Sequence, residues 1–409
     1  SLLNAAILGF YYGLWGTLAY ATYYLSFLTG AVIVDRIRFH HGCESIQQFL
    51  ADRFGAIGPA CYNVVIALRL VSEVFANLLV IGILFGVAGS SGYTLSIIGF
   101  AIVTLVYSML GGLQASLRTD VFQMIVFLVT LTILLVLTIS TGLVSQGSLL
   151  FKPFVITDPG PILIAVALLQ VWSYPMHDPV MMDRGFLADR ETTRRSFIHA
   201  CWLSVTCIVL FGLLGVIAGA NALEGEGMNA ALMRLLGDVP MFLFNAALII
   251  SAMSTLDSTL SSAAKLVIAD LRWLKMSLVN GRTVMVLFMV LGLGFVFLDN
   301  QDLFSAVAVS GTASMYLFPV ILFCVLGNRQ RIATWSYLCS FTVAVVGAAL
   351  YFLESSGHSA WLGDAHKYTK LLWICLSVLF IGCATFWLGS HRLAINESAN
   401  KTDSKEIRG

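Results

Sequence analysis

The sequence predicts an all-α polytopic membrane protein, and three observations support this prediction. Hydrophobic residues make up 58% of the 409 residues and charged residues only 11%, whereas a soluble domain carries about 25% charged residues. The apolar residues gather in runs long enough to cross a bilayer, and Lys and Arg concentrate in alternate loops. Because backbone groups in lipid must be satisfied internally, we expect the runs to form helices.

The apolar runs set the number of helices, since a spanning helix needs about 20 mainly apolar residues. Eleven runs meet this requirement and predict about 11 transmembrane helices: 5–34, 60–87, 93–110, 121–142, 160–176, 197–220, 238–264, 281–298, 303–327, 333–354 and 368–389. They form one transmembrane domain over residues 1–389. The polar residues 390–409 predict a disordered cytoplasmic tail. Segment 225–240 is too short and polar to span, and it predicts an amphipathic helix on the outer surface.

Basic residues give the orientation of the chain. Of the 23 Lys and Arg residues, only Lys152, Arg234, Lys367 and Lys370 lie in one set of alternating loops, and Arg69 lies inside a span. The other set, together with the tail, holds the rest and is therefore cytoplasmic. We expect a multi-pass protein of the plasma (inner) membrane with its C-terminus inside. The net charge of +1 indicates no nucleic-acid partner.

Run 238–264 carries an unusual number of oxygen-bearing side chains. Hydroxyls recur at helical spacing at Ser251, Ser254, Thr255, Ser258 and Ser262. Asp257 lies at the edge of this stripe. Hydroxyl, carbonyl and carboxylate oxygens suit a small, hard cation. The alternative is that these side chains only pack, with their hydroxyls bonded to the carbonyl four residues earlier.

The turn between runs 93–110 and 121–142 carries a second candidate, Asp120. Gly111 and Gly112 permit a tight reversal at the cytoplasmic face, and Asp120 then falls in the first turn of the next helix. As an alternative, this carboxylate only faces the helix dipole. Ser258 lies about 10 Å above the inner end of its own helix. Because Asp120 enters from the same side, the two can meet in the inner half of the membrane.

A third candidate is the end of run 160–176 and its exit, where Pro175 and Pro179 prevent a regular helix. Transporters place substrate sites at such broken helices. Trp172 and Tyr174 can form an aromatic wall, or they can be interface aromatics beside prolines that merely end the helix. His177 beside Asp178 is weak evidence for a metal.

Arg69 and Glu73 lie four residues apart inside run 60–87. This spacing predicts an ion pair turned away from lipid, with a structural role.

Together these motifs resemble the sodium:solute symporter family, which includes sodium/glucose, sodium/proline and sodium/sialic-acid cotransporters. Gly111, Gly112, Ala115, Thr119, Asp120 and Gln123 look like the family signature. Ala252 to Ser258 look like its sodium-site helix. Asp178-Pro179 with Asp183-Arg184 look like its broken helix, although Gln more often precedes that proline. The resemblance covers almost the whole chain.

The resemblance implies an inverted five-helix-repeat (leucine-transporter-like) core with two C-terminal helices. It implies that two family helices, including core helix one, precede Ser1. The main sodium site would take Ser251 by its carbonyl, Ser254 and Thr255. A second site would take Asp120, Ser254, Asp257 and Ser258. Trp172, Tyr174, His177 and Asp178 are guesses for the solute site.

We therefore expect sodium-coupled symport of a small organic solute by alternating access, with Na⁺ as the coupling ion and no organic cofactor. We expect a monomer or weak oligomer in the bilayer. Two alternatives stay open: a solute sensor, and a truncated homologue that does not transport. A membrane enzyme is disfavoured because no nucleophile–base pair, metal triad or phosphate loop is evident.

Overall fold

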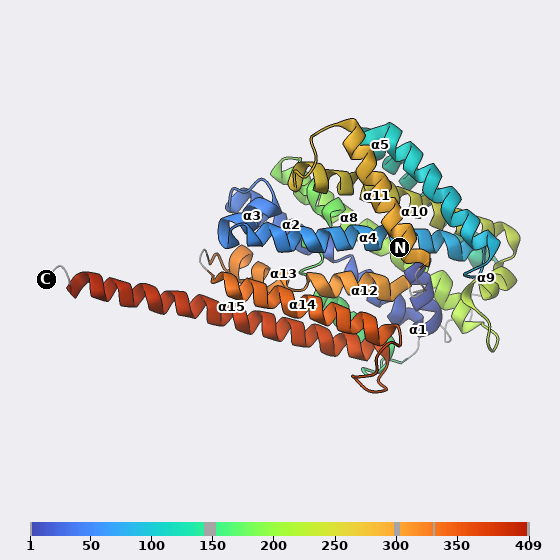
Figure 1. Cartoon of the computed structure of the whole chain (residues 1–409). Helices are drawn as coiled ribbons and strands as arrows, with labels where there is room; N and C mark the ends of the chain where they lie inside the picture. Colours follow the sequence, from blue (N-terminus) through green and yellow to red (C-terminus); the bar gives the residue numbers. More distant parts are fainter. Residues whose placement is uncertain (1, 143–152, 298–302, 330–331, 407–409) are drawn as a thin grey trace. The chain divides into compact units, whose positions relative to one another are not determined.

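The computed structural model describes residues 2–142, 153–297, 303–329 and 332–406, with the side chains of 111–119, 303–306 and 391–406 left out. Within these residues every regular element is a helix (Figure 1). The chain divides into two compact units. Unit 1 comprises Ser1–Leu25, Ala67–Leu168 and Ala200–Val307, and unit 2 comprises Ser26–Ile66, Leu169–His199 and Ala308–Gly409.

The α-helices are α1 (Leu2–Tyr23), α2 (Ser26–Val34), α3 (Ile46–Phe54), α4 (Ile57–Phe85), α5 (Ser91–Ser140), α6 (Pro159–Gln170), α7 (Pro179–Gly185), α8 (Arg190–Ala220), α9 (Met228–Leu236), α10 (Asp238–Lys265), α11 (Leu278–Phe297), α12 (Leu303–Ser314), α13 (Leu317–Pro319), α14 (Thr334–Ser355) and α15 (Lys367–Glu406).

The described helices make the chain a multi-pass membrane protein. Nine helical stretches among the described residues are long and apolar enough to cross a bilayer: α1 and α2 contribute to one, Leu2–His40, and α5 contributes two, Ser91–Leu110 and Asp120–Ser140. A bent pair, Val307–Ser314 with Leu317–Leu326, adds a tenth if it forms one span. The sequence predicted about eleven. The difference lies at 160–176, where α6 has only 12 residues. The two prolines that follow α6 stop the helix before it can span, because proline lacks the N–H that a helix interior needs.

The start of the chain differs from the predicted single span over 5–34. Gly13 adopts a non-helical conformation inside α1, with φ 65° and ψ −152°, which glycine reaches without a steric penalty. A Cβ built on Gly16 would lie 2.1 Å from the backbone oxygen of Leu8. The residues on the two sides of Gly13 therefore fold back against each other, and 2–12 is a separate short helical segment.

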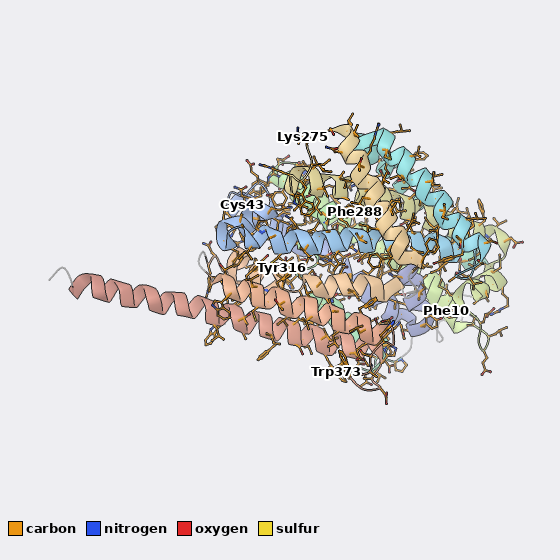
Figure 2. The ribbon with its side chains drawn as sticks, in the orientation of Figure 1. Phe10, Cys43, Lys275, Phe288, Tyr316 and Trp373 are labelled. Atoms are coloured by element: carbon orange, nitrogen blue, oxygen red, sulfur yellow. The ribbon has the colours of Figure 1, made fainter. Side chains whose placement is uncertain are left out.

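Glycines let this first segment pack tightly within unit 1. A Cβ on Gly215 of α8 would lie 1.9 Å from the backbone oxygen of Ala6, and one on Gly219 would lie 2.2 Å from that of Phe10, which Figure 2 labels. The two glycines are four residues apart and so share a helix face. In membranes such small-residue faces permit close backbone approach, which replaces the hydrophobic drive available in water.

Unit 2 is built around buried tyrosines. The Tyr337 hydroxyl of α14 donates to the carbonyl of Gly58 over 2.8 Å, and the Phe54 ring stacks on the Tyr337 ring with centroids 4.2 Å apart. Tyr316, labelled in Figure 2, is fully buried at the break between α12 and α13 and meets the Tyr337 ring edge-on. These contacts join α3, the start of α4, the bent pair and α14.

Helices α14 and α15 lie side by side in unit 2 (Figure 1). A Cβ on Gly382 would lie 2.8 Å from Ser340 Oγ, and one on Gly389 would lie 2.7 Å from Ser336 Oγ, so the glycines set this close spacing. Helix α15 is assigned to Glu406, over residues where the sequence predicts a disordered tail. The cytoplasmic tail over 390–409 stays a prediction, and residues 407–409 lie outside the described residues. Neither glycine nor proline occurs between 391 and 406, so nothing in this polar stretch ends the helix.

The predicted amphipathic segment 225–240 contains the short helix α9, which buries Met228, Ala231 and Leu232. The prediction of one transmembrane domain over 1–389 stays a prediction.

Candidate functional site

The oxygen-rich stretch of α10 faces protein rather than lipid. Ser251, Ser254 and Thr255 are half-buried, and Asp257 and Ser258 are buried, with Asp257 only 2% exposed. Side chains that face lipid would be exposed, as Phe242 is on the same helix. Polar side chains at this depth are costly unless they meet other polar groups, and α5 supplies such groups within unit 1.

Asp120 of α5 and Ser254 of α10 are in direct contact. The Ser254 hydroxyl donates to Asp120 Oδ1 over 2.7 Å, a short bond of the kind that a charged acceptor makes. The two side chains are 134 residues apart in the sequence. The structure therefore brings together the family-like signature around Asp120 and the hydroxyl stripe of α10. The sequence predicted this approach for Ser258, and the hydrogen bond is made by Ser254, one turn earlier on the same helix.

Asp120 begins the second of two apolar spans within α5. The helix label covers Ser91–Ser140, but the spans that could cross a bilayer are Ser91–Leu110 and Asp120–Ser140, as the sequence predicted. Tyr107 of the first span donates to the carbonyl of Met253 over 3.0 Å, next to the residue that binds Asp120. A straight helix would separate residues 107 and 120 by about 20 Å and place them on opposite faces. Helix α5 therefore does not run straight between them.

Asp257 lies near this contact. Its Oδ2 atom is buried and has no hydrogen-bond partner in the described part of the chain. Both Asp257 and Asp120 act electrostatically on Tyr107, so the two carboxylates share one neighbourhood. A buried carboxylate oxygen without a donor is costly, and a bound cation would remove that cost. Hydroxyl and carboxylate oxygens are the donors that hard cations take.

Two other predicted ligands on α10, Ser251 and Thr255, are joined by a hydrogen bond. The Thr255 hydroxyl donates to the carbonyl oxygen of Ser251 over 2.9 Å, and the Thr259 hydroxyl donates to that of Thr255 over 2.7 Å. These are the i−4 bonds that the packing alternative predicts. They also hold the Thr255 hydroxyl beside the Ser251 carbonyl, two of the three oxygens that the resemblance assigns to the main sodium site.

The break after α6 is confirmed, and unit 2 satisfies its exposed carbonyls. Helix α6 ends at Gln170, a single 3₁₀ turn covers Pro175–His177, and α7 begins at Pro179. Within the break, the Val171 carbonyl accepts from the Thr29 hydroxyl over 2.7 Å, and the Met176 carbonyl accepts from the Tyr62 hydroxyl over 2.6 Å. Irregular backbone at membrane depth requires such partners.

The four residues predicted to bind solute differ in burial and in contacts along this break. Trp172 and Tyr174 are half-buried. His177 is fully buried, and its ring meets that of Tyr174 edge-on, with centroids 4.8 Å apart. Asp178 accepts from the backbone N–H of Met181 over 3.1 Å and so caps the N-terminus of α7. A structural role is thus established for Asp178, whereas solute binding stays a prediction for all four residues. All four belong to unit 2, and the sodium candidates belong to unit 1.

Arg69 and Glu73 form the predicted ion pair four residues apart on α4. Asn77 extends it by donating to Glu73 Oε1 over 3.2 Å, so the half-buried Glu73 joins the buried Arg69 and Asn77 on one helix face.

Sequence reasoning missed two residues. Tyr107 joins α5 to α10, and no feature of the neighbouring sequence predicted this contact. Gln170 is buried at the end of α6 and contacts Thr312 Oγ1 and Cys375 Sγ, each over 3.4 Å. It thereby fixes the start of the break within unit 2.

Solved transporter structures match almost the whole chain. A substrate-bound, outward-open Na⁺-coupled sialic acid symporter matches with a TM-score of 0.66 and 15% identity, over 95% of this chain and 89% of that one. Mhp1, a nucleobase-cation-symport-1 family transporter in a closed conformation with bromovinylhydantoin bound, matches with a TM-score of 0.55 and 14% identity, over 96% and 89%. MhsT in complex with L-phenylalanine matches with a TM-score of 0.51 and 15% identity, over 95% and 96%.

These matches establish the fold, and they confirm the predicted leucine-transporter-like class. No protein-family model and no curated protein sequence matches the chain.

Proposed function

We propose that this protein is a secondary active transporter that couples the entry of a small organic solute to sodium, and that it is a member of the sodium:solute symporter family. The contact between Ser254 and Asp120 supports this proposal most directly. It joins the two motifs on which the resemblance rests, and it does so in a chain with the fold of known symporters.

Sodium would bind along α10. One ion would use the Ser251 carbonyl and the Thr255 hydroxyl, which already lie 2.9 Å apart. A second would use Asp120, Ser254, Asp257 and Ser258, where a carboxylate oxygen is buried without a hydrogen-bond donor. Sodium prefers hard oxygen donors, and these residues supply carbonyl, hydroxyl and carboxylate oxygens.

The solute would bind at the break between α6 and α7, with Trp172, Tyr174, His177 and Asp178 as the candidate contacts. The matched structures hold or transport sialic acid, a hydantoin and an amino acid. These ligands are small, polar and organic, and we propose a solute of that general class.

Coupling would follow from shared binding energy. Sodium enters down its electrochemical gradient, and the voltage alone contributes about 2.3 kcal/mol per charge per 100 mV. If sodium and solute favour the same conformation, each raises the affinity of the other by an equal factor. The conformation that releases both would open to the cytoplasm, the side on which the basic loops and the C-terminus would lie.

The test replaces Ser254 and Thr255 with alanine, singly and together, and measures solute uptake as a function of sodium. We expect the half-maximal sodium concentration to rise about tenfold or more in the double variant, since two ligand oxygens are lost. Thr283→Ala is the control, because Thr283 is an exposed α11 residue with the same i−4 bond. An unaltered sodium dependence in the double variant would contradict the proposal.

A further inference from the structure

The hydroxyl of Tyr107 lies near Asp120 of α5 and Asp257 of α10. A tyrosine hydroxyl can donate only one hydrogen bond. Its proton is donated to the carbonyl oxygen of Met253 over 3.0 Å. Asp257 and Asp120 both act electrostatically on the same hydroxyl. The lone pairs of the phenol oxygen therefore lie in a neighbourhood that already contains two carboxylates.

The hydrogen bond to Met253 does not by itself explain a tyrosine here. Met253 lies in the interior of α10, where its carbonyl already accepts the N–H four residues ahead. A phenylalanine would leave that helical bond intact and would bury no hydroxyl. Gln123 and Ser108 also interact with the phenol oxygen through their side chains. A tyrosine nevertheless places an additional oxygen beside the two carboxylates, where a phenylalanine would place none, and a cation among these oxygens would offset the repulsion between the carboxylates.

Asp257 provides an independent indication that a ligand belongs at this point. It is 2% exposed, and its Oδ2 atom has no hydrogen-bond donor among the described residues. A buried carboxylate oxygen of this kind is normally bonded. The phenol oxygen cannot satisfy it, because its proton is already committed to Met253.

We propose that Tyr107 supplies a further oxygen to the sodium site of Asp120, Ser254 and Asp257. This inference rests on the proposed function. A neutral phenol oxygen adds a ligand without adding charge, so it favours a bound ion while limiting the repulsion within the site. It also ties the early part of α5 to the site, because residues 107 and 120 approach adjacent residues of α10.

The test compares Tyr107→Phe with Tyr93→Phe in the full-length chain. Tyr93 is a matched control: it lies on the same helix, is 3% exposed and packs against Gly82 away from the carboxylates. Purified protein is heated without sodium and then over a series of sodium concentrations, with choline keeping the ionic strength constant. For Tyr107→Phe we expect the sodium concentration that gives half the maximal Tm increase to rise about three- to tenfold. For Tyr93→Phe we expect no such rise.

The readouts separate a ligand from a merely structural tyrosine. A structural role would lower the Tm without sodium and leave the sodium midpoint unchanged, and that result would overturn the proposal. If wild-type protein shows no stabilisation by sodium over choline, the proposed function fails and this inference fails with it. If wild type responds and Ser254→Ala shifts the midpoint while Tyr107→Phe does not, only the inference fails.

Discussion

Asp178 has one observed role, as a helix cap, and one predicted role, as a solute contact, and a substitution can separate the two. Its carboxylate caps α7, and it is also a predicted solute contact. Asparagine caps a helix about as well as aspartate, whereas alanine loses about 1 kcal/mol. If the solute needs the charge, Asp178→Asn should keep its Tm but lose uptake. Asp178→Ala should lose both.

Uptake and Tm of the two variants, measured side by side, decide the role of Asp178. Wild-type uptake in Asp178→Asn would leave Asp178 as a cap alone and would remove it from the solute site.

Among single residues, the sequence identified the charged and hydroxyl-bearing members of the candidate site but not Tyr107. Asp120 and Ser254 stood out because ionisable and clustered polar groups are rare in apolar helices. A tyrosine is common near membrane interfaces, and nothing in its neighbours indicated that its hydroxyl reaches the Met253 carbonyl. The sequence predicted the reversal at Gly111 and Gly112, but a reversal alone does not specify which side chain of the first span meets α10.

Among the elements, α8 offers a direct test of glycine packing. A methyl group on Gly215 would meet the backbone oxygen of Ala6 at 1.9 Å, and backbone cannot move aside as a side chain can. Overpacking of this kind costs about 1–3 kcal/mol. We expect Gly215→Ala to lower the Tm measurably in detergent.

Gly99→Ala is the control for α8, because Gly99 is exposed and has open space around its Cβ position. It should leave the Tm unchanged or raise it slightly, since alanine favours helix. Equal Tm values for the two variants would contradict the packing of α8 on the first segment.

The loop that leads into α9 gives a pH-dependent prediction. The Arg234 guanidinium, which donates to both carboxylate oxygens of Glu226, lowers the pKa of that carboxyl to about 2. Because the folded pKa lies below the ordinary value, the stabilising contribution is present above about pH 4.5 and is lost as the pH falls toward 2. The Tm of wild type should exceed that of Glu226→Gln at pH 6.

The Tm difference between wild type and Glu226→Gln should shrink as the pH is lowered from 4.5, and high salt should reduce it as well, because the pair is exposed. A difference that stays constant from pH 6 to pH 3 would exclude this ion pair as its cause.

The element boundaries show where sequence patterns stop being informative. Hydrophobic run length placed the long spans well, because it measures the property that the bilayer selects. It did not locate the kink at Gly13, which lies inside an unbroken apolar run. After residue 389 polarity indicated disorder, whereas the helix assignment of α15 runs to Glu406. Polarity reports solvent contact rather than backbone conformation.

For the whole molecule, the central claim is that a sodium gradient drives solute entry. Related scaffolds carry different solutes and functions, so the claim depends on the residues of the site rather than on the fold. The Ser254–Asp120 contact adds a specific reason to expect sodium. Coupling is a property of the entire chain in a bilayer, so it must be measured there.

The most direct measurement is uptake of a panel of radiolabelled sugars, amino acids and carboxylates into proteoliposomes that contain the full-length protein. The account predicts that at least one solute accumulates above its external concentration when sodium is high outside. Accumulation should vanish when potassium replaces sodium or when an ionophore collapses the gradient. Accumulation of the solute to the same level with a potassium gradient, or after the sodium gradient has been collapsed, would contradict the account.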